Sequence, residues 1–265
     1  MNRFALHSVP RSGSSWLGAV LSNHPEVNYF FQPLFSKSFS SQLDINSSLE
    51  EIIEFYSQLY SSNDSFINQI SLGKANDTKN NLARNILYKE VRYHHLLHNL
   101  LVKDPEIKII GLVRNPLSTI NSWLNAPKEF RKDLNWKELE EWRTAPKKNR
   151  NRSEEYNGYE KWKETTLLFE KLDSLYPNRF KLVKYSDLIN NSTESFENIF
   201  HFMNLELHPK VLSFLSKTNS ENNNDAYSIY RKDASDDQWK TQLNPIIIEE
   251  IQKDLLNLGL ENYLL

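Results

Sequence analysis

The chain has 265 residues, of which 39% are hydrophobic and 25% charged, so it is long and apolar enough to bury the core of one large domain. The absence of cysteine excludes disulfides and thiolate metal sites, and a net charge of −2 gives no reason to expect nucleic-acid binding. No apolar run reaches the roughly 18 residues of a membrane span, and no signal peptide precedes the first apolar run. We expect a single domain over 1–265 in a cytoplasmic setting.

The beginning of the chain predicts a strand, a tight loop and a helix. An apolar run over 4–9 leads into Pro-Arg-Ser-Gly-Ser-Ser, and an apolar helical pattern starts at Trp16. The first-turn N–H groups of a helix lack partners within the helix, and the helix dipole favours negative charge there, so such a loop binds anions. Gly13 lets a ligand approach the backbone closely, and Arg11 adds a charged fork of donors. Hydroxyl donors are supplied by Ser12, Ser14 and Ser15.

Two other interpretations of this loop exist. A Ser/Gly turn that only caps the helix is the structural alternative. The ATP-binding P-loop, G-x-x-x-x-G-K-[ST], is a poor match, because the first glycine and the Gly-Lys-Ser/Thr ending are both missing. A nucleotide kinase of P-loop type is therefore disfavoured as a function.

The rest of the chain alternates short apolar runs with helical patterns. The predicted strands are 27–31, 86–91, 109–113 and 180–185, and the predicted helices are 49–60, 94–101, 118–123, 159–175, 196–203, 211–215 and 245–258. The run at 109–113 is continuous, not alternating, which is typical of a buried parallel strand. We expect an α/β fold, a P-loop-like three-layer sandwich with a central parallel sheet flanked by helices.

The strand at 109–113 ends at Arg114. Ligands of an open parallel sheet lie at the carboxyl ends of its strands. We therefore expect Arg11 and Arg114 to face one site, where two arginines and a helix N-terminus suit a ligand with more than one anionic group.

His94 and His98 are spaced to share one face of a helix, which raises the hypothesis of a metal site. No H-E-x-x-H pattern is present, and packing or solvent-facing histidines are the favoured interpretation. No metal is expected. The charged segment 125–158 contains many basic residues, which indicate either a solvated face or a surface that guides an anionic acceptor.

These motifs, in this order, resemble the sulfotransferases that use 3′-phosphoadenosine 5′-phosphosulfate (PAPS). The segment 10–17 looks like the family's 5′-phosphosulfate loop, and 112–122 looks like its 3′-phosphate motif. Residues 185–188 resemble the Tyr-Glu-Asp-Leu end of a strand, and 230–240 resemble the late loop over the nucleotide, with Asp233 in place of the usual glycine. The likeness covers most of the chain; insertions at about 36–85 and 125–158 match least.

The resemblance implies a role for each motif. Arg11, the loop amides and Ser15 hold the 5′-phosphosulfate, and Lys89 stabilises charge on the bridging oxygen. Trp16 either stacks on adenine or belongs to the core. The residues implied in donor binding are Arg11, Ser12, Gly13, Ser14, Ser15, Trp16, Arg114, Ser122, Tyr185, Tyr230, Arg231 and Lys232. The product is 3′-phosphoadenosine 5′-phosphate (PAP), and no metal is required.

Within the family, residues 23–34 look most like carbohydrate 6-O-sulfotransferases, which carry a glutamate as candidate base before the proline. Here that position is Gln32, and a neutral amide cannot take a proton from a hydroxyl. Either the base lies elsewhere, with Glu90 beside Lys89 as first choice and three histidines behind it (His7, His94 and His95), or the base is missing.

The favoured function is therefore sulfuryl transfer from PAPS to a carbohydrate hydroxyl. The alternative is a non-catalytic member that binds the nucleotide or a glycan. Turnover of PAPS separates these two, and metal-dependent ATP binding would indicate the kinase. The oligomeric state is not predicted.

Overall fold

The computed structural model describes residues 1–69, 83–220, 227 and 236–264. The predicted motif residues Tyr230, Arg231 and Lys232, and the departure at Asp233, lie outside the described residues.

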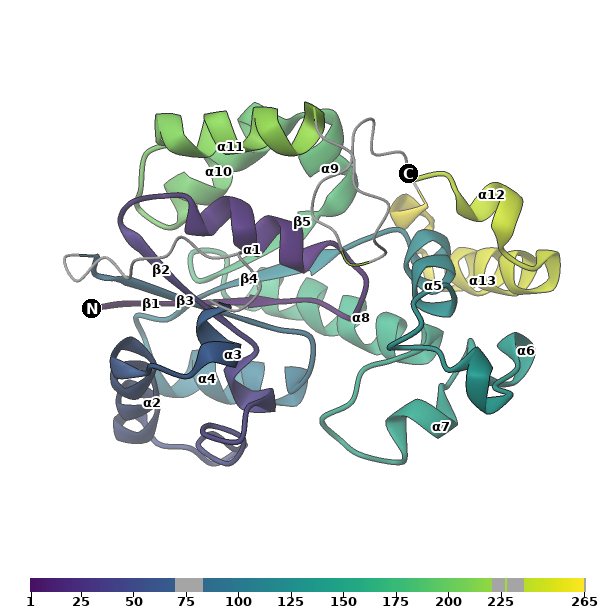
Figure 1. Ribbon diagram of the computed structural model, residues 1–265, viewed down its shortest axis with the longest axis horizontal. Coiled ribbons are helices and arrows are strands. Elements are labelled where there is room, and N and C mark those ends of the chain that lie inside the picture. The colour runs from purple at the N-terminus through teal and green to yellow at the C-terminus, as the bar shows by residue number, and fades with distance from the viewer. Residues whose placement is uncertain (70–82, 221–226, 228–235, 265) are drawn as a thin grey trace.

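A parallel sheet of five strands forms the centre of the described chain. The strands are β1 (Asn2–His7), β2 (Val27–Phe31), β3 (Asn85–Glu90), β4 (Lys108–Val113) and β5 (Phe180–Lys184). Their order in space is β2-β3-β1-β4-β5, so β1 is central. Helices lie on both faces (Figure 1), which confirms the predicted α/β sandwich.

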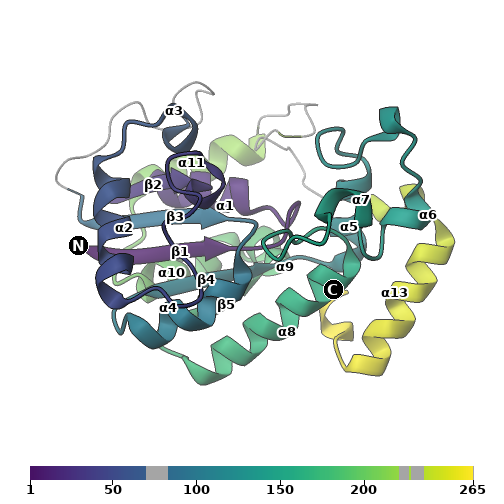
Figure 2. The same cartoon turned by 90° about the horizontal axis from the view of Figure 1, so that it is seen from below.

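Helices connect and cover the strands. They are α1 (Ser14–Ser22), α2 (Leu49–Ser61), α3 (Ser65–Asn68), α4 (Leu97–Lys103), α5 (Pro116–Leu124), α6 (Glu138–Glu141), α7 (Pro146–Asn149), α8 (Tyr159–Leu175), α9 (Tyr185–Asn190), α10 (Ser192–Phe202), α11 (Pro209–Ser220), α12 (Trp239–Gln242) and α13 (Pro245–Leu258). Figures 1 and 2 show α1, α10 and α11 over one face of the sheet and α2, α4 and α8 over the other. Beyond the carboxyl ends of the strands lie α5, α12 and α13.

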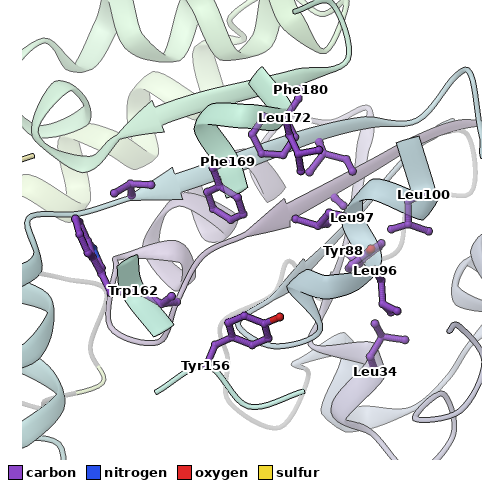
Figure 3. Close-up of a cluster of buried hydrophobic side chains, with 14 of the residues drawn as sticks. Leu34, Tyr88, Leu96, Leu97, Leu100, Tyr156, Trp162, Phe169, Leu172 and Phe180 are labelled. Atoms are coloured by element: carbon purple, nitrogen blue, oxygen red, sulfur yellow. The ribbon is translucent and has the colours of Figure 1, made fainter. Parts of the chain in front are cut away.

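The sheet separates two hydrophobic cores, because successive side chains of a strand point to opposite faces. On one face Leu6 and Leu112 pack with Leu17 of α1. On the other face Tyr88 packs with a larger group of aromatic and aliphatic side chains from α4 and α8. Figure 3 shows this second cluster, with Phe169 and Trp162 turned toward the strands.

Local sequence explains where helices begin. Ser48 caps α2 in a capping box: its hydroxyl accepts from the backbone N–H of Glu51, whose carboxylate accepts from the N–H of Ser48. Asn115 caps α5, accepting from the N–H of Leu117, and Pro116 takes the first helical position.

Two predicted elements differ from the structure. Tyr185, expected to close a strand, begins α9, so its ring projects from a strand-to-helix junction. The helix expected over 94–101 begins as a 3-10 turn, η3 (His94–Leu96), and continues as α4; Tyr93, which precedes the turn, adopts a left-handed conformation with φ of 60°.

The division also separates the histidines that raised the metal hypothesis. His94 is buried, whereas His98 is exposed. Within the described ranges no group of three or more His, Asp or Glu side chains is placed to hold a metal ion. Among the same residues, none of the helices combines the length and apolar character needed to cross a membrane.

Candidate active site

The sheet has a switch point between β1 and β4. From β1 the chain runs outward to β2 and returns through β3, whereas β4 and β5 extend the sheet on the other side. In open parallel sheets ligands bind in the crevice outside the carboxyl ends of the strands at such a point. The β1–α1 loop and the β4–α5 junction at Arg114 both lie there.

The β1–α1 loop has an unusual backbone. Arg11 and Gly13 both have positive φ, 71° and 92°. A Cβ at Gly13 would lie 2.5 Å from a ring carbon of Tyr185, so the Tyr185 ring covers the glycine directly. Glycine is therefore required here twice, by the conformation of the loop and by the close approach of the ring.

Helix α1 starts without the cap that α5 has. No side chain of the described residues caps its N-terminus at Gly13, so its first-turn N–H groups are available to an anion. The hydroxyl of Ser12 is fully buried and has no hydrogen-bond partner among the described residues. A buried polar group without a partner costs about 1–3 kcal/mol, and an acceptor on a bound ligand would remove that cost. Ser14 is buried, whereas Ser15 is exposed at the same end of α1.

The structure brings Arg11, Arg114 and Ser122 together. The Nε atom of Arg11 donates to Ser122 Oγ over 3.1 Å, and Nη1 of Arg114 donates to the carbonyl oxygen of Arg11 over 2.9 Å. A cavity of about 320 Å³ opens beside them. It is lined by Arg11, Arg114, Ser118, Asn121, Ser122, Asn125, Asp236, Gln238, Trp239 and Gln242.

An acidic residue that the sequence did not single out lies in this cavity. Asp236 pairs with Arg114 (Nη2 to Oδ1, 2.5 Å), and its carbonyl oxygen accepts from Ser118 Oγ. The Arg114 guanidinium also lies 4.9 Å from the centre of the Tyr185 ring. The sequence signal for Asp236 is its place within the expected late nucleotide loop, residues 230–240.

Lys89 is a buried cation at the carboxyl end of β3. It is 2% exposed and pairs in register with Leu6 and Phe31, so it shares a sheet face with α1. Its ammonium lies 4.6 Å from the centre of the Phe31 ring. Burial lowers the pKa of Lys89 to about 7, against the opposing influence of Glu90 and Glu129.

Glu90 points to the other face of the sheet, in register with His7. It is fully buried, and its Oε1 accepts from the backbone N–H of Leu34 over 2.8 Å. Burial raises the pKa of Glu90 to about 8. The carboxyl group therefore anchors the turn after β2, and its burial weighs against contact with an acceptor hydroxyl.

The three histidines that ranked after Glu90 as candidate bases differ in their burial. His7 and His94 are buried with their Nδ1 atoms 3.0 Å apart. Burial lowers the pKa of His7 to about 3 and that of His94 well below its ordinary value, so both rings are neutral. His95 is exposed, and its pKa is also lowered, chiefly by desolvation.

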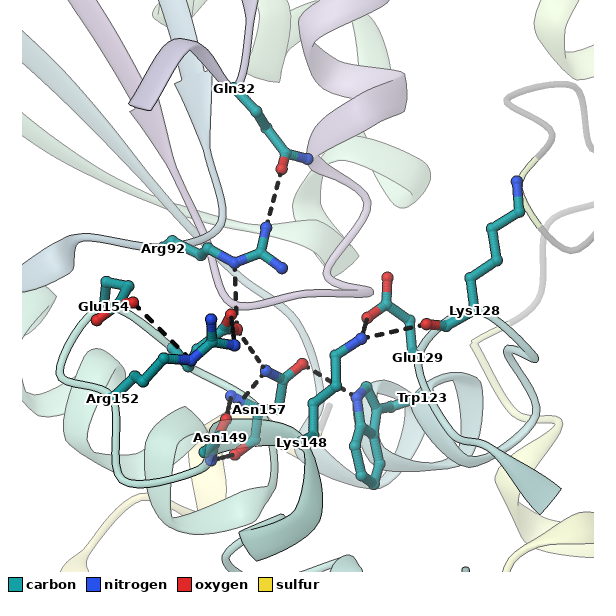
Figure 4. A network of polar contacts seen from close by, with 11 residues as sticks. Gln32, Arg92, Trp123, Lys128, Glu129, Lys148, Asn149, Arg152, Glu154 and Asn157 are labelled. Carbon is teal, nitrogen blue, oxygen red and sulfur yellow. Dashed lines mark hydrogen bonds and ion pairs between the residues drawn. The ribbon is translucent and has the colours of Figure 1, made fainter. Parts of the chain in front are cut away.

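Gln32 belongs to a polar network that reaches the 125–158 segment. Its φ is 43°, and its Oε1 accepts from Arg92 Nη1 over 3.2 Å. Arg92 also pairs with Glu155 over 3.1 Å and lies over the ring of Phe35. Glu155 also pairs with Arg152 over 2.7 Å, and Figure 4 shows Gln32, Arg92 and Arg152 within this network. Sequence reasoning missed Glu155 because no local pattern distinguishes it from the charged residues around it.

Trp16 packs at the edge of a core in this structure. Its ring meets those of Tyr185 and Phe196 edge-on, and its Nε1 donates to Thr218 Oγ1 over 3.3 Å. The side chain is partly exposed. These contacts match the interpretation of Trp16 as an aromatic residue of the core, and its stacking on adenine stays a prediction.

Solved structures share this fold. The mouse sulfotransferase SULT7A1 complexed with PAP is similar at a TM-score of 0.58 and 15% identity, over 95% of this chain and 81% of that one. Retinol dehydratase in complex with androsterone and inactive cofactor PAP is similar at a TM-score of 0.55 and 13% identity, over 96% of this chain and 80% of that one. The sulfotransferase domain from the curacin biosynthetic pathway is similar at a TM-score of 0.54 and 18% identity, over 96% of this chain and 97% of that one. These identities show likeness of fold alone.

No curated protein matches the sequence. A model of the sulfotransferase domain matches residues 2–257, which is almost the whole chain. The closer likeness to carbohydrate 6-O-sulfotransferases is not confirmed by these comparisons and stays a prediction. The motifs, the fold and the family match agree, and the chain belongs to the sulfotransferases, a family of enzymes that transfer a sulfuryl group.

Proposed function

We propose that this sulfotransferase transfers a sulfuryl group from PAPS to a hydroxyl of a carbohydrate. The observation that carries the proposal is the convergence of Arg11, Arg114 and Ser122 on one cavity beside an uncapped helix N-terminus. A donor with phosphate groups at both ends of a nucleoside matches this arrangement of positive charge.

The two phosphate-bearing ends of the donor would bind to different residues of the site. The α1 N-terminus, with Ser12, Gly13, Ser14 and Ser15, would hold the 5′-phosphosulfate; the buried Ser12 hydroxyl gains a partner there. The 3′-phosphate would lie in the cavity against Arg114 and Ser122. Because Arg11 donates to Ser122, it would reach both phosphates. The remaining donor contacts are assigned to Trp16, Tyr185, Tyr230, Arg231 and Lys232.

The chemical step would be in-line displacement at sulfur. The acceptor oxygen forms a bond to sulfur as the bond from sulfur to the 5′-phosphate oxygen breaks, and PAP leaves with that electron pair. Such transfer depends on positioning and charge stabilisation. Lys89, in its protonated form, would stabilise the charge that develops on the bridging oxygen.

The acceptor class is inferred from the insertion after α5. An open pocket of about 300 Å³ lies there, lined by Phe130, Lys132, Asn135, Trp136, Lys137 and Glu138. A tryptophan ring beside amide and charged side chains offers both an apolar face and hydrogen-bond partners, which a sugar ring uses together. Phe130 directly follows Glu129, whose charge acts on Lys89, which supports an acceptor pocket in this part of the insertion.

Gln32 favours a second candidate, a non-catalytic protein that binds PAP or a glycan. Its amide cannot accept a proton, and Arg92 already donates to its oxygen. The predicted cytoplasmic setting is not used by either candidate and stays a prediction.

The test is calorimetric binding of PAP in the presence of a chelator, followed by PAP release from PAPS with a panel of sugars, phenols and steroids. We expect metal-independent binding and release that requires a sugar. Gln32→Glu is run beside the parent protein: activity of this variant alone would establish the binding-only candidate. Turnover with a steroid or phenol but no sugar would contradict the acceptor class.

A further inference from the structure

The segment that follows α5 places one carboxylate, Glu129, in a defined position. The N–H groups of Glu129 and Phe130 both donate to the carbonyl oxygen of Ala126 over 2.8 Å. The buried Phe130 ring packs against Trp123, with ring centres 5.4 Å apart. Glu129 is thus fixed to the end of the helix that begins beside Arg114.

Contacts across the site connect this segment with the donor loop. The N–H of Lys128 donates to the hydroxyl of Tyr227 over 2.7 Å, and the Lys128 ammonium lies 4.7 Å from the centre of that ring. The Arg11 guanidinium lies 5.0 Å from the same ring centre. Lys128 and the phosphate-binding Arg11 therefore lie against the same tyrosine ring, and Glu129 directly follows Lys128 in the chain. The Glu129 carboxylate is also close enough to Lys89 to raise the pKa of that amine.

The carboxylate is held at one oxygen only. Its Oε2 pairs with Lys148 Nζ over 2.8 Å, and the same ammonium donates to the carbonyl oxygen of Lys128 over 3.1 Å. No hydrogen bond or ion pair joins Oε1 to the described part of the chain. Figure 4 shows Glu129 with one oxygen turned to Lys148 and the other away from it. The side chain is 24% exposed, so a substrate can reach it.

We propose that Glu129 is the general base of the transfer, in place of the glutamate that Gln32 replaces. This inference rests on the proposed function. The acceptor hydroxyl gives its proton to Glu129 Oε1, its oxygen forms the bond to sulfur, and the 5′-phosphate oxygen of PAP leaves with the electrons of the broken bond. The carboxylic acid then returns the proton to water. Glu129 fits this role better than Glu90, which is fully buried and bonded to the turn after β2.

The test compares Glu129→Gln with two matched variants. Glu140→Gln removes a carboxylate from the same segment that pairs with Lys147, the neighbour of Lys148, over 3.1 Å. Glu90→Gln removes the other candidate base. A general base contributes about 10²- to 10⁴-fold to the rate, so we expect the kcat of Glu129→Gln to fall by that factor. The PAP affinity of Glu129→Gln and the kcat of Glu140→Gln should stay at the values of the parent protein.

A second variant separates a base from a merely structural residue. Glu129→Ala leaves space for a small carboxylate, and added formate should restore part of the lost kcat without altering PAP affinity. Loss of activity in both Glu129 variants without rescue and with weakened PAP binding would overturn the proposal in favour of a structural role.

The outcomes also distinguish the base from the wider function. Parent-level turnover by Glu129→Gln with a large loss in Glu90→Gln would assign the base to Glu90 and leave sulfuryl transfer intact. A parent protein that binds PAP but releases none from PAPS, with any acceptor or with water, overturns both the base and the catalytic proposal. Failure to bind PAP would overturn the donor assignment itself.

Discussion

The donor side and the acceptor side of this protein are built in different ways. On the donor side, the conformation of a short loop and the N-termini of two helices place Gly13, Ser12 and Arg114 at the ends of neighbouring strands. On the acceptor side, few backbone elements contribute, and ion pairs such as Arg92–Glu155 and Lys148–Glu129 connect segments far apart in the sequence. If the proposed sites are right, the difference teaches that donor binding depends mainly on local backbone geometry, whereas acceptor positioning depends mainly on long-range charge pairs.

Lys89 lies between the two sides, and its loss should have the largest effect. For Lys89→Met we expect kcat to fall about 10²- to 10³-fold, the usual cost of removing one donor that stabilises developing charge. PAP affinity should change little. Because the ammonium is desolvated in the fold, the melting temperature should stay the same or rise. A lower melting temperature together with weak PAP binding would contradict a catalytic role.

The same residue predicts a pH dependence. The pKa of Lys89 is lowered to about 7, so the charged form, which we propose stabilises the leaving group, is lost as the pH rises through that value. We expect kcat of the parent protein to fall on the alkaline side of neutrality. The measurement is a pH profile of kcat, with PAP binding followed over the same range as the control. A kcat that stays constant as the pH rises above 7 would contradict the role of the charged amine.

On the donor side, Arg114→Gln should weaken PAP binding about 10- to 100-fold, since a hydrogen bond to a charged group contributes about 1.5–3 kcal/mol. The effect should diminish at high salt. Calorimetry measures it, with Arg152→Gln as the control from the acceptor side. Equal losses in the two variants would remove the distinction between the two sides.

On the acceptor side, Glu155→Gln removes the carboxylate shared by Arg92 and Arg152. The Arg92 side chain is only 13% exposed, and leaving it without its partner should cost about 1–3 kcal/mol of unfolding free energy. We expect a higher KM for the acceptor and unchanged PAP affinity. Glu154→Gln, whose partner is the exposed Arg152 at 3.9 Å, is the matched control.

The smallest effect should come from Asp236→Asn. The Asp236 carboxylate occupies Arg114 in the cavity assigned to the 3′-phosphate and repels an anion there. Its neutralisation should tighten PAP binding about 2- to 5-fold, the range of a partly exposed ion pair. Titration calorimetry of both proteins at one salt concentration measures the change. Weaker binding by the variant would mean that Asp236 orders the site and does not compete for it.

The sequence by itself determined the parts that depend on neighbouring residues. The continuous apolar run before Arg114, the strand, loop and helix at Gly13, and the strand that carries Lys89 could all be predicted, because strands and helix starts follow local pattern and propensity. The parallel sheet then brought Arg11 and Arg114 to one edge, as its topology requires.

Only the tertiary structure decided which charged residues act together. Glu129 and Glu155 lie in a segment that resembles any solvated charged surface, and each of Glu129, Glu155 and Asp236 has an ion-pair partner 19 or more positions away in the chain. It also decided that Glu90, adjacent to Lys89, points to the opposite face, because one residue along a strand reverses the side chain. Side-chain charge pairs carry no periodic signal in the sequence, and the distances between their partners are set by how the sheet and its helices pack.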